Sequence, residues 1–160
     1  MSADLTYEIL LPAAPEKVFA ILTSSDYLSE KVLHSIKGTF EKSGNSPEFR
    51  IQITRTIDGE LPEMVRKFVG DELTVVEFQN WSEISRENFL AQFELKVNNA
   101  PVEIKGTISL SGTQSTQVSI KAKVKVNVPI FGAMAEPQVV LKLKSVLLDE
   151  ENLCRQWIAK

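Results

Sequence analysis

The chain has 160 residues, a formal net charge of −3 and a single cysteine. This length suits one domain spanning residues 1–160. The charge gives no overall attraction to nucleic acid, and one cysteine excludes an internal disulfide. The apolar runs are far shorter than the roughly 20 residues of a membrane span, and the first residues lack the basic and apolar segments of a secretory signal. We therefore expect a cytoplasmic protein with no stable membrane insertion and no nucleic-acid partner.

The first part of the chain predicts one strand and two short helices. Apolar residues alternate with polar ones over residues 5–11, as in a half-buried strand. The segment 15–22 begins with proline, which is favourable in the first turn of a helix because its missing amide proton has no partner there anyway. Ser25 or Asp26 can cap a second helix that runs to about Val32.

Six further segments alternate between apolar and polar residues and predict strands. They cover residues 36–41, 49–54, 72–81, 89–97, 102–110 and 117–128. Two features depart from this pattern. The segment from Leu61 to Val69 has helical spacing and predicts a short helix or a structured lid. The adjacent Val75 and Val76 suggest a β-bulge or a change of face.

A long amphipathic helix is predicted from Gly132 to Ile158, because apolar residues recur there every three or four positions. Pro137 either marks the true start of this helix or kinks it. Short turns between the strands favour an antiparallel meander, and one apolar face per strand means that one face of the sheet is covered. The covering element must be the long helix, because it has the largest apolar surface.

These elements predict an α+β fold in which a curved, antiparallel, seven-stranded sheet wraps around the C-terminal helix. A curved sheet and one helix do not close on each other everywhere, so we expect a gap lined by apolar side chains, which suits an apolar ligand. The residues expected to form the inward face are Phe49, Ile51, Phe93, Ile104, Ile120, Val124, Val139, Leu143 and Trp157.

The order strand, two helices, six strands and a long helix resembles the START-like helix-grip superfamily, which includes polyketide cyclases, pollen-allergen-type proteins and lipid-transfer domains. The segment 12–22 is similar to its first helix. A finer resemblance is to an uncharacterised, mostly actinobacterial family within it. The residues that carry this resemblance are Thr54-Arg55-Thr56, Leu61-Pro62, Gly70-Asp71-Glu72-Leu73, Trp81, Val128-Pro129-Ile130-Phe131-Gly132 and Glu136. The resemblance implies a helix-grip fold and a cavity for a hydrophobic molecule.

Three polar residues are candidates for contact with a ligand. Arg55 continues the inward face of its strand. A buried guanidinium needs a charged or polar partner, so Arg55 either binds an anionic group of a ligand, pairs with an acidic side chain such as Glu136, or lies at a solvent-exposed rim where the strand ends. Glu136 either stabilises the start of the last helix or faces the mouth of the cavity, where burial can raise its pKa. Tyr7 is either a polar group in the cavity or a core residue with a satisfied hydroxyl.

The remaining residues with reactive side chains indicate no metal site and no cofactor. His34 is the only histidine and has no carboxylate at metal-ligand spacing. Cys154 lies on the apolar side of the last helix, where inert packing is the expected role. The expected ligand-binding set is Arg55, Tyr7, Phe49, Ile51, Phe93, Trp81, Glu136, Val139 and Leu143.

Three functions are compatible with the sequence. The first is binding of a hydrophobic or amphipathic small molecule, with no reaction. The second is a cyclase- or dehydratase-like enzyme, which requires at least two of Arg55, Tyr7 and Glu136 to meet in one cavity. The third is a protein-interaction or chaperone-partner role, which requires an exposed apolar patch such as the segment from Leu61 to Val69. The sequence does not identify the ligand or the oligomeric state.

Overall fold

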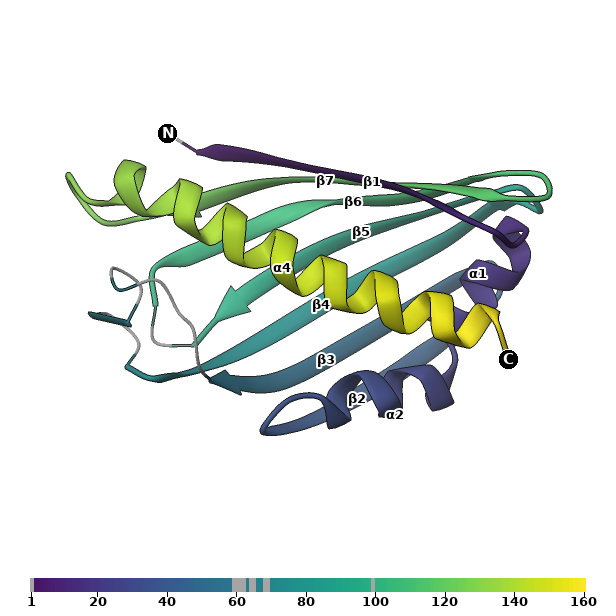
Figure 1. Cartoon of the computed structure of the whole chain (residues 1–160), viewed down its shortest axis with the longest axis horizontal. Helices are drawn as coiled ribbons and strands as arrows, with labels where there is room; N and C mark the ends of the chain where they lie inside the picture. Colours follow the sequence, from purple (N-terminus) through teal and green to yellow (C-terminus); the bar gives the residue numbers. More distant parts are fainter. Residues whose placement is uncertain (1, 59–62, 64–65, 68–69, 99) are drawn as a thin grey trace.

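Seven antiparallel strands form one curved sheet, and the C-terminal helix runs diagonally across its inner face (Figure 1). The computed structural model describes residues 2–58, 63, 66–67, 70–98 and 100–160. The elements, in chain order, are β1 Ala3–Leu11, α1 Pro15–Leu22, α2 Ser25–Leu33, β2 Lys37–Asn45, β3 Glu48–Asp58, β4 Glu72–Ser85, β5 Asn88–Val97, β6 Val102–Gly112, β7 Thr116–Val126 and α4 Gly132–Ile158. The expected α+β helix-grip architecture is therefore confirmed.

The strand order across the sheet is β1-β7-β6-β5-β4-β3-β2. Strands β2 to β7 form a meander, and β1 adds to its last strand, so β1 and β2 are the two edges. The helices α1 and α2 carry the chain from one edge to the other, around one end of the sheet (Figure 1). This connection leaves the inner face open for α4.

The two short helices form where the sequence predicts them, with one correction. Pro15 begins α1, which ends at Leu22 as expected. The cap of α2 is Ser24 rather than Ser25 or Asp26, because the Ser24 hydroxyl accepts a hydrogen bond from the Tyr27 amide. The buried side chains of α2 are Tyr27, Leu28, Lys31 and Val32, so its inward face includes a lysine.

The predicted irregularity at Val75 and Val76 is wrong. Both residues pair in unbroken register with β3 and with β5, and the only register shift between β4 and β5 lies between Glu83 and Ser85. Alternation therefore runs without interruption along the middle of β4. It places Glu77 on the same inward face as Leu73 and Trp81.

Helix α4 spans the predicted residues, and Pro137 lies inside it instead of at its start. The helix packs on β1 and β7 and on both short helices. Glu136 is buried in its first turns, and its carboxylate accepts a hydrogen bond of 2.9 Å from the Val126 amide at the end of β7. This hydrogen bond connects the start of α4 to the end of β7.

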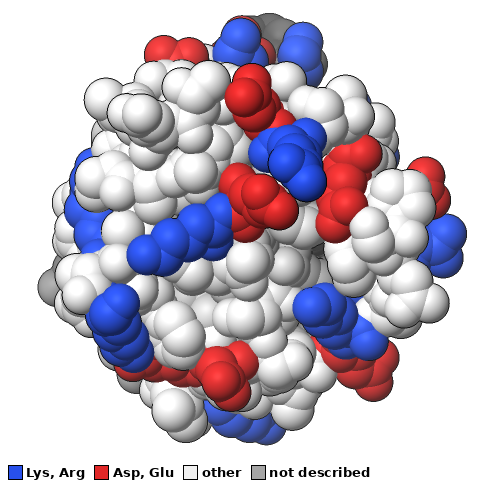
Figure 2. All heavy atoms as spheres, turned by 90° about the vertical axis from the view of Figure 1, so that its right-hand side faces the viewer, with Lys and Arg blue, Asp and Glu red and all other residues white. Residues whose placement is uncertain are grey.

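The outward face of the sheet is polar, as the alternation predicts, with Lys121, Lys123 and Lys125 exposed on β7. On the end of the molecule that carries the C-terminus, acidic and basic side chains are interspersed among uncharged ones (Figure 2). Among the described residues of that end, the basic side chains do not gather into one continuous surface. No helix in the described part of the chain is long and apolar enough to cross a membrane. Most of the segment from Leu61 to Val69, expected to be a helix or lid, lies outside the described residues, which include only positions 63, 66 and 67 of it.

Candidate functional site

A cavity of about 180 Å³ lies between the inner face of the sheet and α4. Most of its wall is aliphatic or aromatic. The apolar lining residues are Leu5, Ile9, Leu11, Leu22, Val75, Trp81, Phe93, Leu95, Ile104, Ile108, Val118, Ile120, Ala122, Leu143, Val146, Leu147 and Cys154. Polar side chains are gathered at two places on this wall, and they give the cavity its chemistry.

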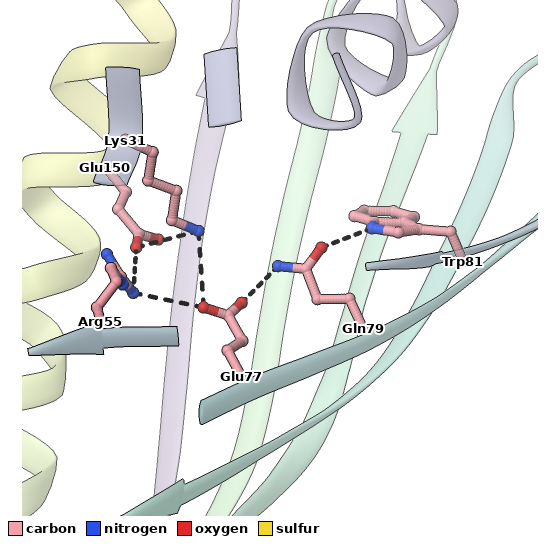
Figure 3. Close-up of polar contacts among 6 residues, drawn as sticks. All are labelled: Lys31, Arg55, Glu77, Gln79, Trp81 and Glu150. Atoms are coloured by element: carbon pink, nitrogen blue, oxygen red, sulfur yellow. Dashed lines mark hydrogen bonds and ion pairs between the residues drawn. The ribbon is translucent and has the colours of Figure 1, made fainter. Parts of the chain in front are cut away.

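The larger polar group is a cluster of four charged side chains, Lys31, Arg55, Glu77 and Glu150, which we call the charged cluster. These side chains come from α2, β3, β4 and α4 and converge on one point (Figure 3). Arg55 Nη2 lies 3.4 Å from Glu77 Oε1 and 3.2 Å from Glu150 Oε1. Lys31 Nζ lies 3.7 Å and 3.3 Å from the same two oxygens. Each cation therefore contacts both carboxylates.

Burial differs among the members of the charged cluster. The exposed fraction of the side chain is 6% for Lys31, 10% for Glu77, 15% for Arg55 and 23% for Glu150. Burial alone raises the pKa of Glu77, but Lys31, Arg55 and a hydrogen bond from Gln79 outweigh it and hold that pKa below 4.5. Burial lowers the pKa of Arg55, and Glu150 and Glu77 more than reverse this. Two cations thus face two carboxylates, and the cluster is internally neutral.

A hydrogen-bonded row along β4 orients Glu77. The Trp81 indole donates a 2.8 Å hydrogen bond to Gln79 Oε1, which leaves the Gln79 amide group to donate to Glu77 Oε2 (Figure 3). Because Trp81 can only donate, its bond fixes the orientation of the Gln79 amide. Glu77 therefore accepts hydrogen bonds from Arg55 and Gln79, forms an ion pair with Lys31, and is held firmly on the cavity wall.

The second polar group on the wall is the pair Tyr7 and Glu151. The Tyr7 hydroxyl donates a 2.7 Å hydrogen bond to Glu151 Oε1, and Arg155 Nε donates to Glu151 Oε2 over 3.0 Å. Burial, and then the bond to Glu151 and its negative charge, raise the pKa of Tyr7 to about 12. Tyr7 therefore stays protonated and serves as a hydrogen-bond donor.

Five of the nine residues expected to bind a ligand line this cavity, and four do not. Those on the wall are Tyr7, Arg55, Trp81, Phe93 and Leu143. Phe49 packs on Phe19 instead, with 5.8 Å between ring centroids. Ile51 and Val139 belong to the packed core, and Glu136 is turned toward the Val126 amide.

The carboxylate partners of Arg55 are Glu77 and Glu150. The prediction that Glu136 could pair with Arg55 is wrong. Sequence reasoning missed Lys31, Glu77 and Glu150, although each has a signal. Lys31 follows Tyr27 by four positions on the apolar face of α2, and Glu77 alternates in step with Trp81. Glu150 follows Leu143 by seven positions and therefore lies on the same side of α4.

A surface groove of about 480 Å³ runs outside the charged cluster, between α2, the end of β3 and α4. Lys31, Arg55, Val146 and Glu150 line both this groove and the inner cavity. The charged cluster therefore stands at the boundary between the cavity and the surface. Glu150 is the most exposed member of the charged cluster.

The outward face of the sheet carries a broader depression of about 710 Å³ around Gly106, and charged and amide side chains such as Lys105, Gln92 and Lys121 line it. This depression is open to water and lacks the apolar enclosure of the inner cavity. Within the described residues, no three His, Cys, Asp or Glu side chains are placed to hold a metal ion. The inner cavity is therefore the better candidate for a ligand site.

The model of a family described as "Protein of unknown function (DUF2505)" matches residues 6–158. None of the curated proteins matches the chain in sequence.

Solved structures share the fold at low sequence identity. The protein TTHA0849 from Thermus thermophilus superposes with a TM-score of 0.61 at 15% identity, over 95% of this chain and 97% of that chain. The Zhui aromatase/cyclase from Streptomyces sp. R1128 gives 0.59 at 8% identity, over 98% and 90% of the two chains. A norcoclaurine synthase from Thalictrum flavum, in complex with dopamine and hydroxybenzaldehyde, gives 0.59 at 13% identity, over 99% and 87%. At these identities the likeness establishes the helix-grip fold alone.

Proposed function

The chain belongs to the DUF2505 family, whose description assigns no activity, and we propose from the geometry of the cavity that the protein binds one small apolar or amphipathic molecule there. The observation that carries this proposal is a partly enclosed, mainly apolar space that has charged side chains at one boundary. Native ligand sites have this composition, with a few polar groups that fix orientation on an apolar wall.

The volume of the cavity limits the size of the ligand. An engineered protein cavity of roughly 150 Å³ holds benzene, whereas sites for drug-sized molecules span about 300–1,000 Å³. The volume of about 180 Å³ thus favours a single-ring molecule or a short chain over a long-chain lipid. The relative crystallised with dopamine and hydroxybenzaldehyde shows that this fold accommodates single-ring molecules.

Binding is favoured over catalysis by the pairing of the polar groups. The enzyme hypothesis needs at least two of Arg55, Tyr7 and Glu136 to meet in one cavity. Arg55 and Tyr7 both line it, whereas Glu136 accepts a hydrogen bond from the Val126 amide instead. The Arg55 and Tyr7 side chains are each occupied by their own carboxylates, Glu150 and Glu151. A general acid or base needs a pKa near the operating pH, and neither Glu77 nor Tyr7 has one.

Binding is tested with 3-phenyl-1-propanol, which combines one ring with one uncharged polar group. Leu147 lines the cavity, whereas its neighbour Leu148 is half exposed, so Leu147→Trp fills the space and Leu148→Trp is the matched control. Isothermal titration is expected to show saturable binding that weakens at least tenfold in Leu147→Trp and stays unchanged in Leu148→Trp. Absence of binding to the wild-type protein contradicts the proposal.

A further inference from the structure

The four members of the charged cluster are not equally fixed in place. Glu77 is held by Lys31, Arg55 and Gln79. Lys31 is almost fully buried between the two carboxylates. Glu150 is the most exposed member and makes its contacts through one oxygen, Oε1. Glu150 is therefore the side chain that can leave with the least disturbance, by turning toward the surface groove that it also lines.

The contacts made by Glu150 are longer than those of a tight ion pair. They measure 3.2 Å to Arg55 and 3.3 Å to Lys31, whereas charge-assisted N–H···O bonds are typically about 2.7–2.9 Å. Arg55 uses only Nη2 in its bonds to described residues, although a guanidinium carries five N–H donors. The two cations thus have N–H donors that these contacts do not use.

Departure of Glu150 would leave two cations and one carboxylate, which is a net positive site at the edge of an apolar cavity. A buried, uncompensated charge is costly, so an uncharged ligand group cannot take the place of Glu150 without loss. An anionic group can, because one carboxylate then replaces another and the cluster stays neutral. An ammonium group would add a third cation to the site, where Glu77 is already paired with Lys31 and Arg55.

We propose that the ligand of this cavity carries a carboxylate, which displaces Glu150 and binds Lys31 and Arg55 while the apolar body of the ligand fills the space under α4. This inference rests on the proposed binding function and adds the chemical class of the ligand, a small carboxylic acid with a single ring or a short chain. Glu150 occupies the carboxylate position when the cavity is empty.

The experiment compares 3-phenylpropanoate with 3-phenyl-1-propanol, which differ in the charged group alone. The variant Glu150→Gln removes the competing charge, and Asp149→Asn, on the same helix and exposed, is the control with the same change in net charge. Titration calorimetry is expected to show at least tenfold tighter binding of the carboxylate to Glu150→Gln, with no more than a twofold change for the alcohol. Asp149→Asn should leave both affinities unchanged.

A measurement on the wild-type protein keeps the test decisive if Glu150→Gln folds poorly, and a double variant tests the part played by Lys31. In the wild-type protein, the Arg55 Nε–H NMR resonance is expected to shift on titration with 3-phenylpropanoate and not with the alcohol. The double variant Lys31→Met/Glu150→Gln, whose remaining cluster of Arg55 and Glu77 is neutral, should lose the gain in carboxylate affinity.

The outcomes separate the two proposals. If the alcohol binds but the carboxylate gains nothing in Glu150→Gln and leaves Arg55 unshifted, the carboxylate inference is overturned and the binding function stands. If neither probe binds to the wild-type protein, both fail.

Discussion

Arg55 on β3 and Glu150 on α4 are 95 positions apart in the chain, yet Arg55 Nη2 donates a hydrogen bond to Glu150 Oε1 over 3.2 Å. This contact joins the sheet to the helix that covers it, at the boundary of the apolar cavity. Its loss would open that boundary and leave Arg55 and Lys31 directed at whatever occupies the cavity. The polar chemistry of the site thus depends on the same ion pairs that hold the helix in place.

Replacement of Glu77 should destabilise the protein strongly. Glu77→Gln leaves Lys31 and Arg55 with one carboxylate between them, and removal of one partner from a buried ion pair typically costs about 3–5 kcal/mol. Urea unfolding at neutral pH measures this loss. The control is Glu103→Gln on the exposed face of β6, which should change the free energy of unfolding by less than about 0.5 kcal/mol.

The difference in stability between wild type and Glu77→Gln should depend on pH. The pKa of Glu77 is lower in the folded state than its ordinary value of 4.5, so its contribution to stability is present above that value and is lost as the pH falls through the folded pKa. The stability difference between wild type and Glu77→Gln should therefore shrink as the pH is lowered from about 7 to about 3. A difference that is constant with pH would show that Glu77 is not ionised in the folded protein.

Glu136 should act as a structural acceptor. Glu136→Ala leaves the buried Val126 amide without a partner, and an orphaned donor costs about 1–3 kcal/mol in unfolding free energy. Glu136→Gln keeps an oxygen at the same place and should lose less, within about 1 kcal/mol of wild type. Equal losses in the two variants, measured by chemical denaturation, would mean that the hydrogen bond contributes nothing.

Tyr7 should titrate late, with a pKa of about 12 that depends in part on Glu151. In a Tyr27→Phe background, which leaves Tyr7 as the only tyrosine, Glu151→Gln is expected to lower this pKa toward 10.0 without reaching it, because burial is the largest cause of the shift. Absorbance of the tyrosinate measures the titration. A pKa that does not move in Glu151→Gln would contradict the described hydrogen bond.

Cys154 offers an independent reporter of the cavity, because its thiol lies on the wall and burial raises its pKa to about 11. The thiolate is the reactive form, so a thiol reagent at mildly alkaline pH should label the native protein slowly and the unfolded protein rapidly. A bound probe such as 3-phenyl-1-propanol should slow the native reaction further. Labelling at the unfolded rate in the native state would place Cys154 outside the cavity.

The architecture could be predicted from the sequence because it depends on local periodicity. The bounds of α4 and the inward faces of the strands follow from apolar spacing alone, and Arg55 was recognised as an inward charge because it continues the face of Ile51 and Ile53. Cavity residues such as Tyr7, Phe93 and Leu143 were identified by the same periodicity.

The charged cluster was not predicted, for two physical reasons. The adjacent valines at 75 and 76 suggest a β-bulge or a change of face, so alternation along this strand did not single out Glu77 as an inward residue. The choice of Glu150 over Glu136 as the partner of Arg55 depends on how α4 crosses the sheet, and periodicity within one element carries no information about a crossing. Pairing between distant elements is a tertiary property.

The central claim is that a small molecule occupies the space between the sheet and α4, and intermolecular NOEs test it most directly. With 3-phenyl-1-propanol bound, we predict NOEs from the ring protons of the ligand to the methyl groups of Ile108, Ile120 and Leu147, which line the cavity from β6, β7 and α4. NOEs confined to Phe78 and Thr107 on the outward face, or no NOEs at all, would contradict the claim.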